Sequence, residues 1–212
     1  MRSGRVTLAA VGRFVASVMM TSGVLLIADA AITLAWQEPI SALVTMREQA
    51  RLEGQLDDLT RLAAQKPGPP RPDGFRPRHG RAFGRIELPT LDRDYVMVEG
   101  TDTPTLRKGP AHYPETPLPG QGGTVAVAGH RTTYLAPFRT IDDLRRRDRI
   151  MLTMPYGRFV YRVEKTRIVR PEDTWVKRRV GYEQLILTAC HPLYSAEKRI
   201  VVFARLARSE RL

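Results

Sequence analysis

The sequence predicts a mainly β domain, built as an antiparallel sandwich or a closed barrel, behind one N-terminal apolar helix. Between residues 83 and 207, several short segments alternate apolar and polar side chains with the period of two that is typical of strands. The 16 prolines and 16 glycines among 212 residues predict frequent turns and exclude an all-helical bundle. A single long apolar run excludes a protein with several membrane spans.

The charge balance is strongly basic. Lys and Arg total 34 against 22 Asp and Glu, which gives a net charge of +12. This excess favours anionic partners such as phospholipid, anionic wall polymer or nucleic acid. The chain has one cysteine, so an intramolecular disulfide and a thiolate metal cluster are both excluded.

Residues 14–36 form an apolar run with one charge, Asp29. Because about 20 helical residues cross the hydrocarbon core of a bilayer, the run is long enough to span a membrane. Residues 1–13 carry three arginines and no acid, which predicts a cytoplasmic tail and an extracytoplasmic remainder. The alternative is a signal peptide cleaved near Ala28-Asp29-Ala30. The apolar run continues past that site to Trp36, which favours an uncleaved anchor.

Two connecting segments follow the anchor. In residues 37–66, leucines recur at steps of three and four among charged residues, which predicts an amphipathic stalk helix. The pattern leaves open whether this helix pairs with a second copy or packs on its own domain. Four prolines in the first six residues of 67–82, and four arginines in the whole segment, predict a semi-rigid basic linker with little to bury.

The β domain is expected over residues 83–207, followed by a short tail, 208–212. Short helical pieces are expected around Thr103–Lys108, Ala136–Leu144 and Trp175–Arg179. The segments that read as strands are 85–89, 95–99, 124–129, 149–154, 158–169, 184–189 and 199–206.

Cys190 closes the apolar strand 184–189, and a strand end is where a rigid scaffold presents a side chain to a surface cleft. A cysteine nucleophile reacts as its thiolate, which requires a base or a cation nearby. The alternative is a buried cysteine that packs as a small hydrophobic residue. An unpaired thiol in an extracytoplasmic domain is open to oxidation, which favours a functional role.

Four histidines are candidates for the partner of this thiol. His130 follows the strand 124–129, and two strand ends can meet at one rim of a barrel. His79 lies in the linker, His112 lies in a loop rich in proline and glycine, and strand geometry turns His191 away from its neighbour Cys190. Spacing therefore favours His130 only modestly over the other three.

Arg199 opens the last predicted strand, nine residues after Cys190. A hairpin would return it to the side of the cysteine. A guanidinium stays charged, so it can hydrogen-bond a carbonyl or stabilise an oxyanion, although it cannot act as a base.

Three segments together resemble the sortase family, the membrane-bound cysteine transpeptidases of Gram-positive cell surfaces. They are Ala128-Gly129-His130-Arg131, Leu187-Thr188-Ala189-Cys190 and Arg199-Ile200-Val201-Val202, in the family's order. Residues 109–138 and the run around Cys190 are most similar to the class E group, which is common in actinobacteria. The resemblance covers residues 83–207 and implies an eight-stranded β-barrel with short helices.

The resemblance also implies roles. Cys190 would be the nucleophile, His130 the general acid and base, and Arg199 the ligand of the substrate carbonyl or oxyanion. The partners would be secreted proteins with a C-terminal Leu-Pro-x-Thr-Gly or Leu-Ala-x-Thr-Gly signal, an acceptor amine on a peptidoglycan precursor, and membrane lipid. No metal, organic cofactor or nucleic acid is expected. Many members carry threonine where this chain has Ala189. The residues expected near the substrate are Thr132, Thr133, Tyr134, Thr188 and Ala189.

Two alternatives stay open. A pilin-polymerising sortase would carry a lid with an Asp-Pro-aromatic motif, which Asp73-Gly74-Phe75 matches only in part because the proline is absent. A non-catalytic, membrane-tethered module that binds wall polymer or nucleic acid would explain the charge. It gives no reason for Cys190, His130 and Arg199 to occur together.

Overall fold

The computed structural model describes residues 8–35, 39–65 and 72–210. The chain divides into two compact units, Met1–Pro39 and Ile40–Leu212, and each is described by itself. The first contains helix α1 (Leu8–Ala35), of which Ala10–Ile32 is apolar and long enough to cross a membrane. The predicted N-terminal apolar helix is confirmed. The first seven residues of the expected tail, and Trp36, lie outside the described residues.

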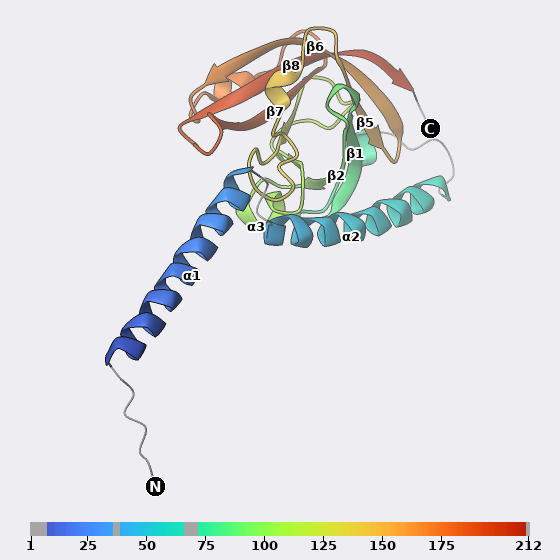
Figure 1. Cartoon of the computed structure of the whole chain (residues 1–212). Helices are drawn as coiled ribbons and strands as arrows, with labels where there is room; N and C mark the ends of the chain where they lie inside the picture. Colours follow the sequence, from blue (N-terminus) through green and yellow to red (C-terminus); the bar gives the residue numbers. More distant parts are fainter. Residues whose placement is uncertain (1–7, 36–38, 66–71, 211–212) are drawn as a thin grey trace. The chain divides into compact units, whose positions relative to one another are not determined.

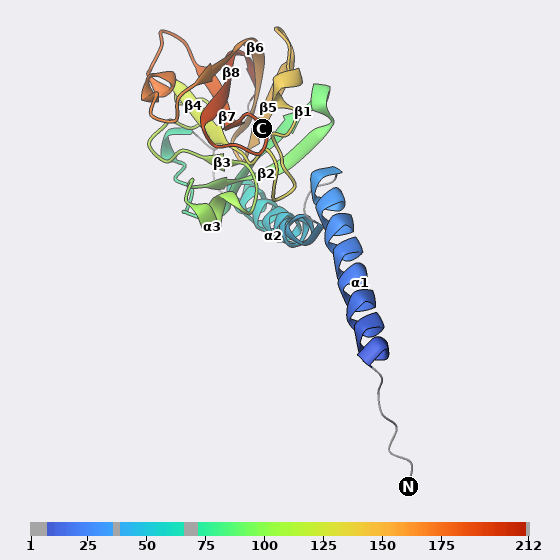
Figure 2. The same cartoon turned by 60° about the vertical axis from the view of Figure 1, so that its left-hand side comes forward.

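The second unit contains a closed β-barrel (Figures 1 and 2). In the part of the chain that the structure describes, eight strands form the barrel in the order β1-β2-β3-β4-β7-β8-β6-β5. The predicted β fold is therefore confirmed as a barrel, and the sandwich alternative is wrong. The strands are β1 (Ala82–Leu88), β2 (Arg93–Glu99), β3 (Ala111–His112), β4 (Thr124–Ala128), β5 (Arg149–Met154), β6 (Gly157–Val169), β7 (Gln184–His191) and β8 (Lys198–Glu210).

All seven segments that read as strands are strands. The eighth strand, β3, has two residues, which is too short to show an alternating pattern. Strand β8 continues to Glu210, into the expected tail, because it pairs with the start of β6, where Arg158 lies opposite Glu210.

The interior of the barrel is filled by the side chain at every second strand position. On β7 these are Leu185, Leu187 and Ala189, and on the neighbouring β8 they include Ile200 and Val202, all nearly inaccessible to solvent. Because successive strand residues point to opposite faces, the intervening residues lie on the outside of the barrel. This alternation fixes which side chains can contribute to a surface site.

Helix α2 (Pro39–Ala64) packs on the outside of its own domain, which was one of the two arrangements expected (Figure 1). Leu52 and Leu56 are buried against outward-facing residues of β1 to β3. The Gln49 side chain bonds Val96 as a neighbouring strand would: its Oε1 accepts from the Val96 N–H at 2.9 Å, and its Nε2 donates to the Val96 carbonyl at 3.1 Å. These bonds matter because an unpaired, buried backbone group is costly.

The expected linker is more ordered than its composition predicts. Its described part, residues 72–81, packs on the barrel because Phe75 contacts the core and meets the Tyr156 ring at 5.4 Å. Tyr156 directly precedes β6, whose other end, Val169, lies opposite Arg199. The Asp73-Gly74-Phe75 segment therefore lies at the opposite end of the barrel from Cys190 and does not cover it.

The helical pieces are shorter than expected. They are α3 (Thr103–Leu106), where the Asp102 side chain accepts from the Thr105 N–H, and the 3-10 turns η3 (Ile141–Asp143) and η4 (Thr174–Lys177). The segment expected to be helical from Ala136 begins helical structure only at Ile141. Residues 134–136 have φ angles of 53°, 62° and 39°, which a right-handed helix cannot accommodate.

The burial of Leu52 predicts that α2 contributes to the stability of the barrel. The substitution Leu52→Ala should lower the free energy of unfolding by about 2–5 kcal/mol, because it leaves a cavity between helix and sheet. The measurement is urea unfolding of the full chain in detergent micelles, followed by tryptophan fluorescence. The control is Leu62→Ala, since Leu62 is on the same helix and exposed. Equal effects of the two substitutions would contradict this packing.

Candidate active site at one end of the barrel

Strand β7 has two neighbours, and the hydrogen-bond register with each brings the predicted site residues to one end of the barrel. Strand β4 runs parallel to β7, with Ala128 opposite Thr188, and the Gly129 N–H extends this ladder by donating to the Thr188 carbonyl at 3.0 Å. His130 and Cys190 each lie two residues beyond this last pair. Adjacent strands are about 4.8 Å apart, so the backbone delivers both residues to one rim.

The antiparallel pairing of β7 with β8 places Cys190 directly opposite Arg199. Residues opposed in this way have Cα atoms about 4.5–5.5 Å apart and side chains on the same face. Since Ala189 and Ile200 point into the barrel, Cys190 and Arg199 point outward. The hairpin expected from the sequence is therefore present.

Cys190 is a half-buried free thiol. Arg199 is also half-buried, and its Nη1 donates to the carbonyls of Ala196 and Lys198 at 2.9 and 3.0 Å. These two bonds hold the guanidinium on the backbone of the β7–β8 turn. Among the described residues its other nitrogens form no hydrogen bond, so they are available to an incoming carbonyl.

His130 is held by the loop that follows β4. The ring of Tyr134 packs on the imidazole with centroids 4.9 Å apart, in the stretch of left-handed backbone. The Phe138 N–H donates to the His130 carbonyl at 3.0 Å, and the Phe138 ring leaves no room for a side chain at Gly129. Within the described part of the chain, the buried His130 Nε2 has no hydrogen-bond partner.

Burial and a nearby cation both act on this imidazole. The pKa of His130 is lowered, chiefly by removal of the ring from solvent and additionally by the positive charge of Arg107. Arg107 follows α3, and its guanidinium lies over the Tyr134 ring, 5.4 Å from the centroid. The site therefore disfavours the imidazolium, and a protonated His130 is a stronger acid than a histidine in water.

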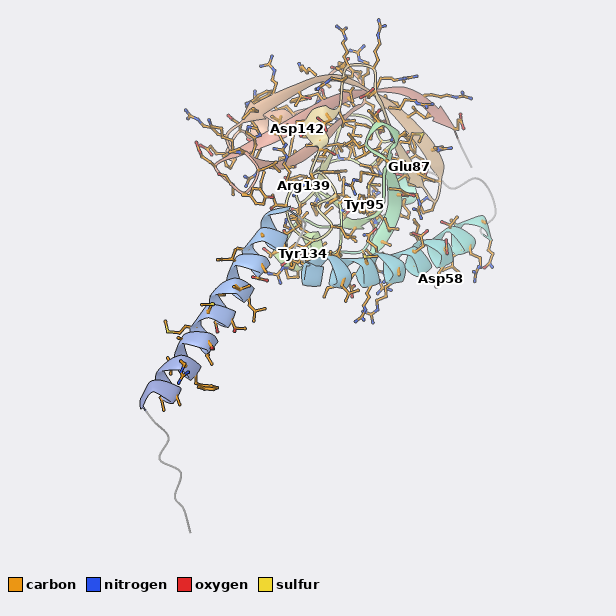
Figure 3. All side chains as sticks on the ribbon, viewed as in Figure 1. Asp58, Glu87, Tyr95, Tyr134, Arg139 and Asp142 are labelled. Atoms are coloured by element: carbon orange, nitrogen blue, oxygen red, sulfur yellow. The ribbon has the colours of Figure 1, made fainter. Side chains whose placement is uncertain are left out.

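Arg131 connects the two segments that carry His130 and Cys190. Its side chain is almost fully buried, and it donates to the Arg139 carbonyl at 3.2 Å and to the Nδ1 of His191 at 3.1 Å. It also pairs with Asp142 of η3 at 2.6 Å (Figure 3 labels Arg139 and Asp142). A guanidinium only donates, so Nδ1 of His191 accepts and any single ring proton sits on Nε2.

The two remaining histidines, His112 and His79, interact with residues outside this site. His112 is buried on the inner face of the barrel, with its Nδ1 2.8 Å from Glu99 and its Nε2 3.1 Å from Thr116. A cleft of about 640 Å³ beside it, lined also by Phe75, does not include Cys190, His130 or Arg199. His79 is exposed and pairs with Asp102 at 2.8 Å.

Beyond Cys190, the outer face of β4, β7 and β8 is a second buried apolar cluster. It consists of Ala126, Ile186, Val201 and Phe203, which are at most 3% exposed because Val176, from the connection between β6 and β7, covers them together with Tyr113 and Val169. Its polar margin includes a contact of 3.2 Å between the hydroxyls of Tyr113 and Thr188. Lys177 joins the flanking segments, because it pairs with Glu115 at 2.5 Å and lies over the Tyr113 ring.

Of the five residues expected near the substrate, three are half-buried and two, Thr188 and Ala189, are buried. Thr188 is on the outer face, and Thr132, Thr133 and Tyr134 are half-buried in the loop after His130 (Figure 3 labels Tyr134). Ala189 does not lie on the outer face of the barrel or in this loop. Its side chain is 4% exposed and packs in the barrel core, because it alternates with the outward-facing Cys190.

Comparison with known proteins identifies the family of this barrel. Residues 86–207 match the Sortase domain family model. This chain belongs to the sortase family. Sortases are cysteine transpeptidases.

Relatives support the assignment. Sortase D of Bacillus subtilis is 36% identical over 135 residues, which cover 62% of this chain and 67% of the relative. Sortase E of Streptomyces avermitilis superposes with a TM-score of 0.58 at 34% identity, over 63% of this chain and 93% of that structure. Sortase E1 of Streptomyces coelicolor, with a tripeptide in the active site, gives a TM-score of 0.60 at 26% identity, over 64% and 94%. The chain spans only 58% and 56% of the length of the Streptomyces coelicolor sortases SrtE2 and SrtE1.

The sequence assigned no role to two arginines of the site, Arg131 and Arg107. Arg131 follows His130 directly, but an arginine in a polar turn looks like a solvated residue, and only the fold shows it buried. Arg107 lies 23 residues before His130 and no motif links the two. Only the fold brings them to the site, because the loop after β4 packs against the end of α3, where Arg107 lies over the Tyr134 ring.

The charge of Arg107 gives a testable prediction for His130. In Arg107→Ala, the pKa of His130 should rise towards that of a free histidine, because removing a cation removes repulsion of the imidazolium. The measurement is an NMR titration of the His130 ring in the full chain. Arg208→Ala, near the far end of β8, is the control and should leave the midpoint unchanged. A midpoint that stays or falls in Arg107→Ala would rule out this electrostatic contact.

Proposed function

We propose that this protein is a membrane-anchored transpeptidase of the class E type, which joins secreted proteins to an amine of the cell wall. The observation that carries the proposal is the register of β7, which brings Cys190 opposite Arg199 and level with His130. A nucleophile, a proton carrier and a fixed cation at one rim are the groups that acyl transfer requires.

In the first half of the reaction, the Cys190 thiolate attacks the carbonyl carbon of threonine in a Leu-Pro-x-Thr-Gly or Leu-Ala-x-Thr-Gly signal. The S–C bond forms, and the carbonyl oxygen becomes an oxyanion that Arg199 stabilises. The C–N bond to glycine then breaks. Protonated His130 gives its proton to the departing amine, and its lowered pKa makes this transfer easier.

In the second half, the amine of a peptidoglycan precursor attacks the thioester carbonyl. The new C–N bond forms as the S–C bond breaks, and the proton lost by the amine passes to His130. The Cys190 thiolate and the His130 imidazolium are thereby restored. Dividing one difficult step into two easier ones is the advantage of covalent catalysis.

The substrate peptide would lie at the end of β4 and β7, beside Cys190 and the loop after His130. The tripeptide in the active site of sortase E1 from Streptomyces coelicolor supports a peptide as the ligand of this site. Thr188 and the loop residues 132–134 would contact the signal next to the scissile bond. Ala126, Ile186 and Val201 are themselves buried beneath Val176, so they would support this end of the barrel and would not contact the signal.

The N-terminal segments would place the enzyme at its substrates. In this proposal residues 1–13 lie in the cytoplasm, 14–36 span the membrane, and the stalk (37–66), linker (67–82), barrel (83–207) and tail (208–212) lie outside. Both the unprocessed protein and the lipid-linked acceptor are held at the outer leaflet. Tethering the enzyme there raises its effective concentration for both.

The thioester intermediate gives the direct test. Mass spectrometry of the purified chain, mixed with a panel of sorting peptides but no amine, should show one acyl group on Cys190. Adding an amine should remove this group and yield the joined product. Cys190→Ala should lose both signals while keeping the circular dichroism of the folded barrel. Joined product from Cys190→Ala would overturn the proposal.

Arg199 has a role that can be separated from its charge. Arg199→Ala should lower kcat/KM by 10²–10³-fold, about 2.7–4 kcal/mol, as expected for loss of one oxyanion ligand. Arg199→Lys should recover only part of this loss, because an ammonium lacks the planar fork. Lys198→Ala, one position away and opposite His191, is the matched control. Arg199→Ala with the activity of this control would remove Arg199 from the mechanism.

A further inference from the structure

The first turns of α2 present their apolar side chains away from the barrel. Ser41 and Thr45 face the domain and are only 9% and 1% exposed, and the Thr45 hydroxyl lies 3.2 Å from the Arg107 carbonyl, which accepts from it. Leu43, Val44 and Met46 are 51%, 53% and 58% exposed, and we call these three residues the outer apolar patch. A helix of a water-soluble domain normally has the opposite arrangement.

The outer apolar patch ends at Met46. From residue 47 onwards the exposed side of α2 is mostly polar, with Leu62 as the exception, and Leu52 and Leu56 turn inward to meet the barrel. Three of the four large exposed apolar side chains in the described part of α2 therefore lie in the half nearest to α1 in the sequence. The charged residues on the exposed side beyond it are Arg47, Arg51, Asp57, Asp58 and Arg61 (Figure 3 labels Asp58).

Chain connectivity limits what this patch can meet. Leu43 follows the end of α1, Ala35, by eight residues, of which the last five belong to α2. Even with the other three fully extended, eight such residues reach at most about 20 Å. The headgroup region on each side of a bilayer is about 5–8 Å thick. If α1 spans the membrane, the patch therefore stays within about 20 Å of the end of the membrane helix.

We propose that the outer apolar patch inserts into the boundary between headgroups and acyl chains of the outer leaflet. This inference rests on the proposed anchoring by α1. The charges along α2 agree with a lipid partner: Arg47 directly follows the patch, where a long cationic side chain reaches lipid phosphates, while Arg51 pairs with Glu48 at 3.2 Å. Asp57 and Asp58 lie further along, away from an anionic surface. The helix then fixes one side of the barrel towards the membrane.

Depth-dependent fluorescence quenching tests this proposal in the full chain. In a Cys190→Ala background, single cysteines are introduced by Leu25→Cys in α1, Val44→Cys in the patch and Asp58→Cys on the exposed far part of α2. Each is labelled with NBD and reconstituted into vesicles of 3:1 phosphatidylcholine and phosphatidylglycerol that contain nitroxide lipids. The label at 44 should show blue-shifted emission and strong quenching by a shallow nitroxide, several-fold above that at 58.

The three sites separate the possible failures. Quenching at 25 without quenching at 44 would overturn the inference and leave the anchor in place. Absence of quenching at both would overturn the anchor as well. A label at 44 that is shielded from water, unquenched by lipid and in energy transfer with a second labelled copy would show that another chain covers the patch, which also overturns the proposal. Val44→Ser, with a label at 46, should reduce quenching if apolar contact drives insertion.

Discussion

The pairing of β7 with both of its neighbours is the constraint on which the candidate site depends. A one-residue shift of the parallel β4–β7 register would turn either His130 or Cys190 to the other face of the sheet. The interior side chains make such a shift costly, because Leu185, Leu187 and Ala189 would then leave the core. The closed barrel thus fixes the position of a surface site through the packing of residues that never touch a substrate.

The electrostatics of the site follow from the same arrangement. Three arginines belong to this end of the barrel, and they differ in what they contact. Arg199 keeps guanidinium nitrogens that can bind a substrate. Arg107 acts on His130 through its charge, and Arg131 forms its hydrogen bonds and ion pair within the protein. A cationic, partly buried environment favours the negative charge that develops during acyl transfer. Burial and the charge of Arg107 also disfavour the His130 imidazolium, so a protonated His130 gives up its proton more readily.

Much of this could be predicted from the sequence, for identifiable reasons. Strands such as β5 and β6 alternate regularly, so their period is visible, and the order of His130, Cys190 and Arg199 matches a known family. The two-residue β3 has no period, and the packing of Phe75 is hidden in a segment whose prolines and arginines indicate a linker. The prediction for Ala189 is wrong because closeness in sequence does not mean closeness in space. Adjacent strand residues point to opposite faces of the sheet. Because Cys190 points outward, Ala189 points into the core.

The junction between α2 and β2 also determines which fragment of this chain can be handled alone. Gln49 completes the hydrogen bonds of Val96, where the two-residue β3 leaves an edge of β2 without a strand partner, and Leu52 and Leu56 cover the apolar surface beside it. A fragment cut to begin within the linker would leave that edge and that surface in water. Exposed strand edges of this kind recruit other strands, so the trimmed barrel would tend to self-associate. Recombinant versions that omit the membrane helix should therefore start before α2, not after it.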